Sequence, residues 1–147
     1  FMTKIADDKI TKNVLSSELK KMITLDNGFI YSDPEFLYEL CKELKQNELT
    51  QYNYLKSISA VDYIEYFELV YHLDSMIYNT SIVIKTKIYG RNNLSVKSLT
   101  SLWKGAELQE REIWDLMGIY FDGHPNMKRI LLWEGFKGHP LRKDFLK

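Results

Sequence analysis

The chain has 147 residues, of which 45% are hydrophobic and 27% charged, and its twenty basic residues balance its twenty acidic ones. A chain of this length fits one compact domain, which buries enough surface to fold without a metal ion or a disulfide framework. A net charge of zero creates no global field that would attract nucleic acid or an anionic membrane. The composition therefore argues against a nucleic-acid partner.

The cysteine content and the apolar stretches narrow the possibilities further. Cys41 is the only cysteine, and an iron–sulfur cluster held by protein thiolates needs several, so this chain cannot hold one alone. The apolar stretches fall well short of the ~20 residues that a membrane-spanning helix requires. We therefore expect a chain that reaches a membrane only through partners.

The first third of the sequence predicts two helices and a short strand. Apolar residues recur with helical spacing over 11–23, which indicates a helix there. Asn27-Gly28 is a turn signal, and the strand-like run Phe29–Tyr31 follows it. Asp33 before Pro34 then reads as an N-cap with proline at the first helical position, and the helix is expected to run from there to about Gln46.

The middle of the sequence predicts three strands and one more helix. Tyr54–Ala60, Phe67–Asp74 and Ser81–Tyr89 are rich in β-branched and aromatic residues, and the short turns between them favour antiparallel pairing. A helix is expected from about Leu102 to Met117. This order predicts an α+β fold, in which a mixed, largely antiparallel sheet packs on helices in two layers, with a core domain at residues 1–121.

Residues 122–147 have neither a helical nor a strand period. They contain six basic residues against three acidic ones, and also glycine, proline and aromatic side chains. Aromatic residues are unusual in a solvated, disordered tail. We interpret this segment as an extended C-terminal arm that becomes ordered on a partner, with a tail wrapped over its own domain as the alternative.

The residues Glu110, Arg111, Glu112 and Asp115 form a dense charged cluster. Paired carboxylates can act as a general acid and base, but on a helix Glu110 and Glu112 point roughly 160° apart and cannot flank one bond. Arg111 and Asp115 lie four residues apart, where they can form an ion pair. The pattern predicts a solvated or interface-facing helix with one internal ion pair and no catalytic residue.

Two histidines stand in similar triplets, Gly123-His124-Pro125 and Gly138-His139-Pro140. The residue before a proline prefers extended conformations, so each triplet predicts a bend that exposes the imidazole ring. No partner at metal-ligand spacing accompanies either ring, so a metal site is not expected. The charged run at 142–144, between Leu141 and Phe145, suits an interface anchor in which the arginine offers a bidentate fork.

These segments resemble one known family. Glu110-Arg111-Glu112, Asp115-Leu116-Met117, His124, Lys128 and Ile130-Leu131 occur with the spacing of the signature of the 30-kilodalton subunit family of respiratory complex I. The run from Gly138 to Asp144 is similar to that family's Gly-His-Pro-Leu-Arg-Lys-Asp segment. The resemblance extends over about residues 55–147, with agreement only in pattern before that.

The resemblance implies a non-catalytic structural subunit of the peripheral arm of NADH:quinone oxidoreductase, where it would support the quinone-reducing module in electron transfer coupled to proton translocation. Its partners would be the large quinone-site subunit and the small subunit that holds the terminal iron–sulfur cluster. The chain itself would bind no cofactor, because the iron–sulfur clusters, FMN and quinone would belong to partner subunits. It would lie on the cytoplasmic face of the bacterial inner membrane or on the matrix side of the mitochondrial one.

The residues expected to contact partners share the charged helix and the arm: Glu110, Arg111, Glu112, Asp115, His124, Lys128, Arg129, His139, Arg142, Lys143 and Asp144. The main alternative function is the equivalent subunit of a membrane-bound, energy-converting [NiFe] hydrogenase or a related ferredoxin or quinone oxidoreductase. A free-standing enzyme that uses Glu110, Glu112 and His124 is disfavoured by the divergent helical geometry. A nucleic-acid module that uses the basic tail is disfavoured by the neutral charge.

Overall fold

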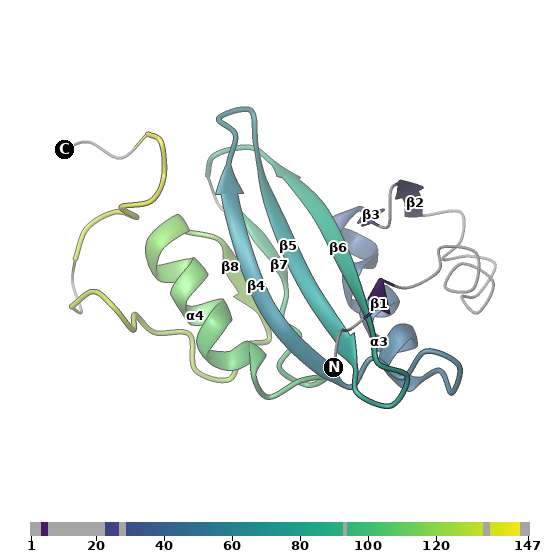
Figure 1. Cartoon of the computed structure of the whole chain (residues 1–147). Helices are drawn as coiled ribbons and strands as arrows, with labels where there is room; N and C mark the ends of the chain where they lie inside the picture. Colours follow the sequence, from purple (N-terminus) through teal and green to yellow (C-terminus); the bar gives the residue numbers. More distant parts are fainter. Residues whose placement is uncertain (1–3, 6–22, 27–28, 93, 134–135, 145–147) are drawn as a thin grey trace.

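The computed structural model describes residues 4–5, 23–26, 29–92, 94–133 and 136–144, which form an α+β fold (Figure 1). The described elements, in chain order, are β1 (Lys4–Ile5), β2 (Ile23–Asp26), β3 (Phe29–Ser32), the 3-10 turn η1 (Pro34–Phe36), α3 (Leu37–Gln46), β4 (Tyr54–Asp62), β5 (Tyr66–Ser75), β6 (Thr80–Tyr89), β7 (Ser95–Lys97), α4 (Ala106–Met117) and β8 (Tyr120–Asp122). The fold class predicted from the sequence is confirmed.

Six of the described strands form one mixed sheet with the order β2–β3–β6–β5–β4, and β1 also pairs with β6. β4, β5 and β6 pair antiparallel through short connections, as the sequence predicts. β2 is antiparallel to β3, whereas β1 and β3 both run parallel to β6. In the described part of the chain β4 is therefore an edge strand, and Figure 1 shows α4 beside it.

Alternation along the strands turns one face of the sheet toward the helices. Ile82, Ile84 and Ile88 of β6 are buried, while the two lysines between them lie on the opposite face and are partly exposed. This is the period-two pattern of a half-buried strand. Every second residue of β6 therefore contributes its side chain to the face of the sheet that packs on the helices.

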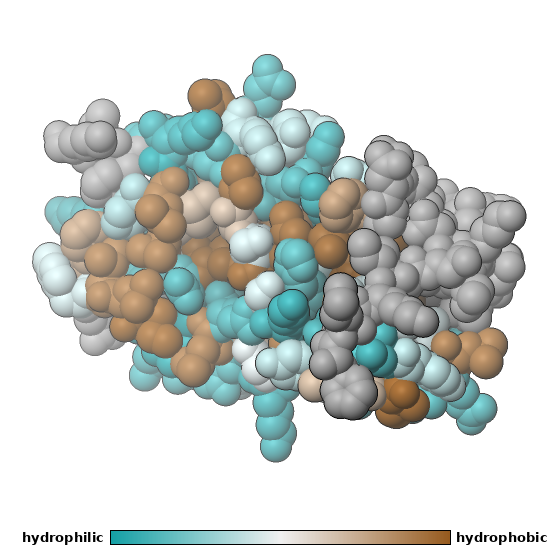
Figure 2. All heavy atoms as spheres, viewed as in Figure 1, coloured by the Kyte–Doolittle hydropathy of each residue, from teal (hydrophilic) through white to brown (hydrophobic). Residues whose placement is uncertain are grey.

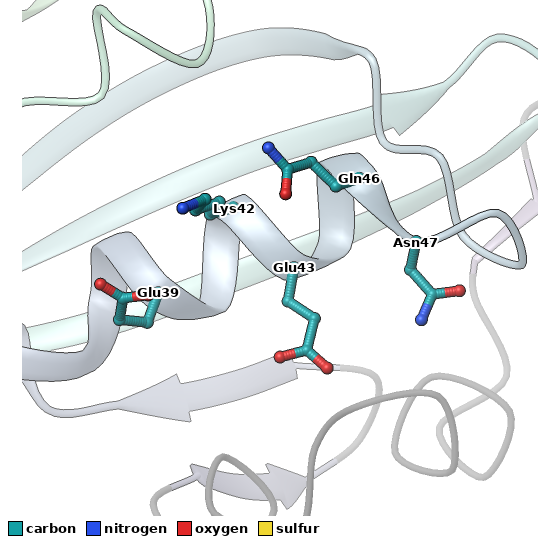
Figure 3. Close-up of a pocket in the computed structure, with 5 residues that line it drawn as sticks. All are labelled: Glu39, Lys42, Glu43, Gln46 and Asn47. Atoms are coloured by element: carbon teal, nitrogen blue, oxygen red, sulfur yellow. The ribbon is translucent and has the colours of Figure 1, made fainter.

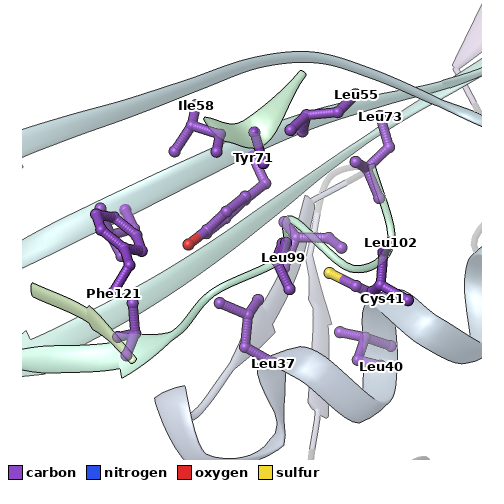
Figure 4. Close-up of a cluster of buried hydrophobic side chains, with 14 of the residues drawn as sticks. Leu37, Leu40, Cys41, Leu55, Ile58, Tyr71, Leu73, Leu99, Leu102 and Phe121 are labelled. Atoms are coloured by element: carbon purple, nitrogen blue, oxygen red, sulfur yellow. The ribbon is translucent and has the colours of Figure 1, made fainter. Parts of the chain in front are cut away.

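Both described helices pack against that apolar face. Leu37, Leu40, Cys41 and Leu44 of α3 follow helical spacing and are fully buried. Figure 4 shows side chains of α3 opposite Tyr71 and other residues of the sheet, with Phe121 of β8 in the same cluster. The contribution of α4 is Ala106, Ile113 and Met117. Burial raises the pKa of the Cys41 thiol, so this group stays protonated and serves as a small apolar side chain.

A second sheet of two parallel strands, β7 and β8, flanks α4 in the sequence. Gly118 ends the helix with a φ of +80°, a left-handed conformation that glycine adopts without a steric penalty. The chain therefore turns directly from α4 into β8, which leads on to the arm.

Two details of the predicted elements are corrected, and one predicted helix lies almost wholly outside the described residues. The helix expected from Leu102 begins at Ala106, because the residues before Ala106 form turns. Within this stretch the Trp103 indole donates to the Tyr52 carbonyl oxygen. Asp33 holds the N-cap position, but its side chain makes no capping hydrogen bond and Pro34 opens a 3-10 turn before α3. The helix predicted over 11–23 lies outside the described residues except at Ile23, which starts strand β2.

The Tyr71 hydroxyl is a buried donor with no hydrogen-bond partner in the described part of the chain. Because a buried, unsatisfied polar group costs about 1–3 kcal/mol, Tyr71→Phe is expected to raise the free energy of unfolding by about 1 kcal/mol. Urea denaturation monitored by circular dichroism measures the change. A loss of stability of similar size would contradict the expectation and reveal a partner for the hydroxyl.

Candidate functional site

The signature helix α4 turns two of its carboxylates into the protein. Glu110 has no accessible surface, and its carboxylate accepts hydrogen bonds from the Ser98 hydroxyl at 2.6 Å and from the Leu99 amide at 2.9 Å. Burial raises its pKa from the usual 4.5 to about 7, although both hydrogen bonds oppose that shift. Glu112 is exposed, so the predicted divergence of Glu110 and Glu112 is confirmed and excludes a carboxylate pair.

Asp115 is the second buried carboxylate of α4 and has no accessible surface. One oxygen, Oδ2, accepts the three successive backbone N–H groups of residues 130–132 at 2.8–3.1 Å. The other, Oδ1, lies 2.6 Å from a guanidinium nitrogen of Arg129. Burial alone would raise the pKa of Asp115, but these four donors outweigh it and hold the pKa below the usual value.

Arg129 connects α4 to two further points of the arm, residues 122–147. Its guanidinium donates to the carbonyl oxygens of Phe136 and Gly138, each at 2.9 Å, as well as to Asp115. Its Cζ atom lies 5.6 Å from the ring centroids of both Trp114 and Phe136. Arginine suits this position because its planar fork donates in several directions and packs against aromatic rings.

The predicted ion pair between Arg111 and Asp115 is wrong. Arg111 instead donates to the backbone carbonyl oxygens of Lys128 and Arg129, at 3.1 and 3.2 Å. Asp115 faces the arm, where Arg129 and the amides of residues 130–132 supply its hydrogen-bond donors. Lys128 itself is exposed.

The two histidines are partly buried, which corrects the prediction of exposed rings. His139 Nδ1 donates to the Asp115 carbonyl oxygen at 3.0 Å, and its ring covers Gly118, where an added Cβ would lie 2.7 Å from a ring carbon. His124 Nε2 lies 2.9 Å from the Glu107 carbonyl oxygen, and its Nδ1 accepts the Asn126 amide. Each ring therefore serves as a local hydrogen-bonding element of the arm.

A second ion-pair cluster fastens the far end of the arm to the sheet. Asp62 at the end of β4 is almost fully buried and forms a bidentate pair with Arg91, at 2.6 and 2.8 Å. This guanidinium holds the pKa of Asp62 well below its usual value, even though burial opposes it. Asp62 also accepts the Lys143 amide, and Asp144 pairs with Arg91 at 2.8 Å.

Backbone contacts complete the attachment between the two clusters. The Leu141 amide donates to the Leu116 carbonyl oxygen, and Arg142 donates to the carbonyl oxygens of Met117 and Arg91 at 2.8 and 2.7 Å. The Met117 carbonyl lies at the C-terminal end of α4, where a cation is favoured. In this chain the described part of the arm thus wraps over its own domain, which was the alternative interpretation of the segment.

The wrapped arm presents apolar side chains to the outside. Ile130, Leu131, Trp133 and Leu141 are 38–69% exposed, and we call these four residues the arm patch. Figure 2 shows hydrophobic residues gathered on the side of the molecule that carries α4 and the arm. Exposed apolar surface commonly marks protein–protein contacts where it is contiguous. Glu110 and Asp115 are satisfied inside the chain, whereas partner contacts of the other predicted residues stay a prediction.

The described residues contain no group of three or more side chains that could hold a metal ion. One surface pocket is lined by Glu39, Lys42, Glu43, Gln46 and Asn47 of α3 and the residue after it. Figure 3 shows that these side chains point in different directions rather than toward a common centre. Among the described helices, none is long and apolar enough to cross a bilayer.

Comparisons with known proteins identify the family. Residues 30–147 match the model of the family described as the 30 Kd subunit of respiratory-chain NADH dehydrogenase, and the chain belongs to this family. The C-type subunit of NADH-quinone oxidoreductase from Moorella thermoacetica is 48% identical over 111 residues, which are 74% of this chain and 73% of the relative. A C-type subunit of the same oxidoreductase from Rhizobium etli is 43% identical over 115 residues, covering 76% of this chain and 60% of that protein.

The chain thus spans between three fifths and two thirds of the length of the first relatives that it matches. One chain in the solved structure of the membrane-bound sulfane sulfur reductase, an archaeal respiratory membrane complex, has the same fold with a TM-score of 0.79. It is 22% identical, and the superposition covers 94% of this chain and 84% of that one. The recognition of the complex I family from the sequence is confirmed.

Sequence reasoning missed two residues that fasten the arm, Asp62 and Arg91. Asp62 is the last residue of β4, whereas Arg91 lies two residues after β6. The two stand 29 positions apart, so no local spacing relates them. The available signal was that Asp62 lies two residues after the predicted strand Tyr54–Ala60, within the part of the chain that resembles the family. Asp62 is buried at the end of β4, and a buried carboxylate needs a partner, which the sequence alone does not identify.

Removal of the Asp115 charge should destabilise the whole protein. Asp115→Asn keeps the shape but leaves the partly buried Arg129 without its carboxylate, and breaking such a pair costs roughly 3 kcal/mol. Urea unfolding measures the loss. The control is Glu112→Gln on the exposed face of the same helix, with an expected change within about 0.5 kcal/mol. Equal effects of the two substitutions would contradict the role of Asp115.

Stability should also depend on pH through Glu110. Its folded-state pKa of about 7 lies above the usual 4.5, so the folded protein binds this proton more tightly than the unfolded chain. The associated stability is complete below pH 4.5 and is lost as pH rises through 7, by roughly 3 kcal/mol in total.

Glu110→Gln removes this titration, so the stability of the wild type relative to the variant should fall between about pH 5 and 8. Thermal or urea unfolding of both proteins over that range measures the difference. A difference that does not change with pH would show that Glu110 titrates as it does in the unfolded chain.

Proposed function

We propose that this chain is a structural, non-catalytic subunit of the peripheral arm of an NADH:quinone oxidoreductase, where it supports electron transfer from NADH to quinone coupled to proton translocation. The observation that carries the proposal is the family match over residues 30–147, together with relatives named as subunits of that oxidoreductase. The described geometry agrees with it, because Glu110 and Asp115, the two buried carboxylates of the signature, are engaged by contacts inside the chain.

The proposed partners are the large quinone-site subunit and the small subunit with the terminal iron–sulfur cluster. The arm patch offers the kind of surface such partners would cover, since interface cores are apolar and rich in aromatic residues. The flavin, the quinone and the iron–sulfur clusters would reside in partner subunits. Association with the membrane would be peripheral, on the side where the partners lie, namely the bacterial cytoplasm or the mitochondrial matrix.

The physical role of such a subunit is to fix positions. A redox module works only if its centres are held to fractions of an ångström by their supporting shells. The two ion-pair clusters make the arm of this chain a defined surface before any partner binds, so less ordering entropy is lost on assembly.

Purification of the tagged full-length chain from its native host in mild detergent, followed by mass spectrometry, tests this function. Recovery of NADH-binding flavoprotein subunits is expected. A nickel-bearing large subunit in their place would assign the chain to an energy-converting hydrogenase, and the absence of any redox partner would refute both functions.

The arm patch gives a sharper test. Leu131→Arg alters a side chain that is 59% exposed, so the isolated chain should keep its melting temperature while recovery of partner subunits falls about tenfold or more. The matched control is Leu49→Arg, which changes a leucine that is 65% exposed in the loop after α3. If Leu131→Arg and Leu49→Arg recover partners equally, the arm patch is not the interface.

A further inference from the structure

We infer that the free edge of β4, in the groove between β4 and α4, receives an extended segment of a partner polypeptide as an additional strand. This inference rests on the proposed function, since it assigns a binding mode to a partner of the same assembly. It concerns a surface distinct from the arm patch except at Leu141, which borders both.

The first observation is the hydrogen-bonding state of the β4 edge. The Ile58 N–H points away from β5 and donates to the Gln109 side chain of α4 at 2.6 Å. Residues of an antiparallel strand alternate in direction, so the N–H and C=O of Ala60 also point away from β5. In the described part of the chain no strand pairs with this edge. An unpaired edge of this kind is a template for another strand.

The second observation is the cavity beside this edge. Ile58, Ser59 and Ala60 of β4 form one wall, and the remaining walls come from α4 and the arm: Gln109, Glu112, Ile113, Leu116, Met117 and Leu141. Its volume is about 230 Å³, which is below the ~300–1,000 Å³ typical of small-molecule sites. The space therefore suits an inserted side chain better than a cofactor.

The groove has defined ends. At one end the Gln109 side chain accepts the Ile58 N–H, and at the other end the Asp62 carboxylate accepts the Lys143 amide. Ile58 and Asp62 are four residue steps apart along β4, or about 13 Å at ~3.3 Å per residue. A strand of about three or four residues fits along this length. The binding mode is the addition of a strand to a sheet edge beside a helix, in which backbone hydrogen bonds provide affinity and a side-chain pocket provides specificity.

The lining indicates the chemistry of the occupant. Leu116 and Leu141 frame the cavity with apolar surface, and Leu141 is 60% exposed. Glu112 is an exposed carboxylate at the same cavity. The complementary segment is extended, places one aliphatic or aromatic side chain between the two leucines, and carries a lysine or arginine that reaches Glu112.

Hydrogen exchange in the assembled complex tests the inference directly. If a strand pairs with β4, the Ala60 amide should exchange about tenfold more slowly or better in the complex than in the isolated full-length chain. Equal exchange rates in the two states would overturn the inference. Protection that appears in the isolated chain as it dimerises would also overturn it, because the occupant would then be a second copy.

A substitution provides the second measurement. Ala60→Pro removes the outward N–H but leaves the β4–β5 hydrogen bonds in place, and proline is tolerated on edge strands in this orientation. We expect a melting temperature within about 5 °C of wild type and a loss of partner recovery of about tenfold or more from the native host. Unchanged recovery would overturn the inference.

Matched control substitutions distinguish an effect on the groove from an effect on folding and from a failure of the proposed function. Leu108→Arg alters an exposed side chain of α4 that does not line the groove, so its partner recovery should equal that of wild type. Ala60→Arg keeps the N–H, fills the groove and should lose partners as Ala60→Pro does, which covers the case of a proline variant that fails to fold. If wild type recovers partners of another class, the proposed function fails while the comparison of these variants still decides the groove.

Discussion

A buried carboxylate without accessible surface, Asp115, imposes the constraint on which the arrangement of the arm depends. An unpaired charge in such a position costs several kcal/mol, so the chain must bring donors to it. Among the described residues only the arm provides them, as three successive backbone amides and the Arg129 guanidinium. Arg129 in turn fixes the carbonyl groups of Phe136 and Gly138. One aspartate therefore fixes the path of residues 129–132 and, through Arg129, of Phe136 and Gly138, in a part of the chain where no described residue lies in a helix or strand.

The same constraint reverses the expected distribution of polar and apolar surface. The charged signature of α4 turns inward, where Glu110 holds the segment before the helix and Asp115 holds the segment after it. The backbone of residues 130–132 must face Asp115, and Ile130 and Leu131 are left 38% and 59% exposed. The described part of the arm thus presents apolar side chains outward, whereas Lys128 of the arm and Glu112 of α4 are exposed charges.

Periodicity predicted the core elements well because their burial depends on local spacing. The predicted strands 54–60, 67–74 and 81–89 lie within β4, β5 and β6, and α3 ends at Gln46 as predicted. Alternation and helical repeats can be recognised within a single segment. The arm could not be predicted in this way, because its contacts join Asp115 to Arg129 and Asp62 to Lys143, up to 81 positions apart. The error at Arg111 has the same origin: an i,i+4 pair is the best local choice, but a buried carboxylate takes the partner that satisfies it most fully.

The contact between Asp62 and the Lys143 amide also affects the order in which the chain can fold during synthesis. It joins the first long strand of the core to nearly the last described residue, and contacts of such long sequence separation form late in folding. During synthesis, residue 62 leaves the ribosome long before residue 143. Asp62 therefore gains its contact with the Lys143 amide, and Arg91 its pair with Asp144, only after the end of the arm has been made. A nascent or truncated chain that stops short of it would carry Arg91 and Asp62 without the closing amide. This attachment of the arm is therefore complete only in chains that extend past residue 143.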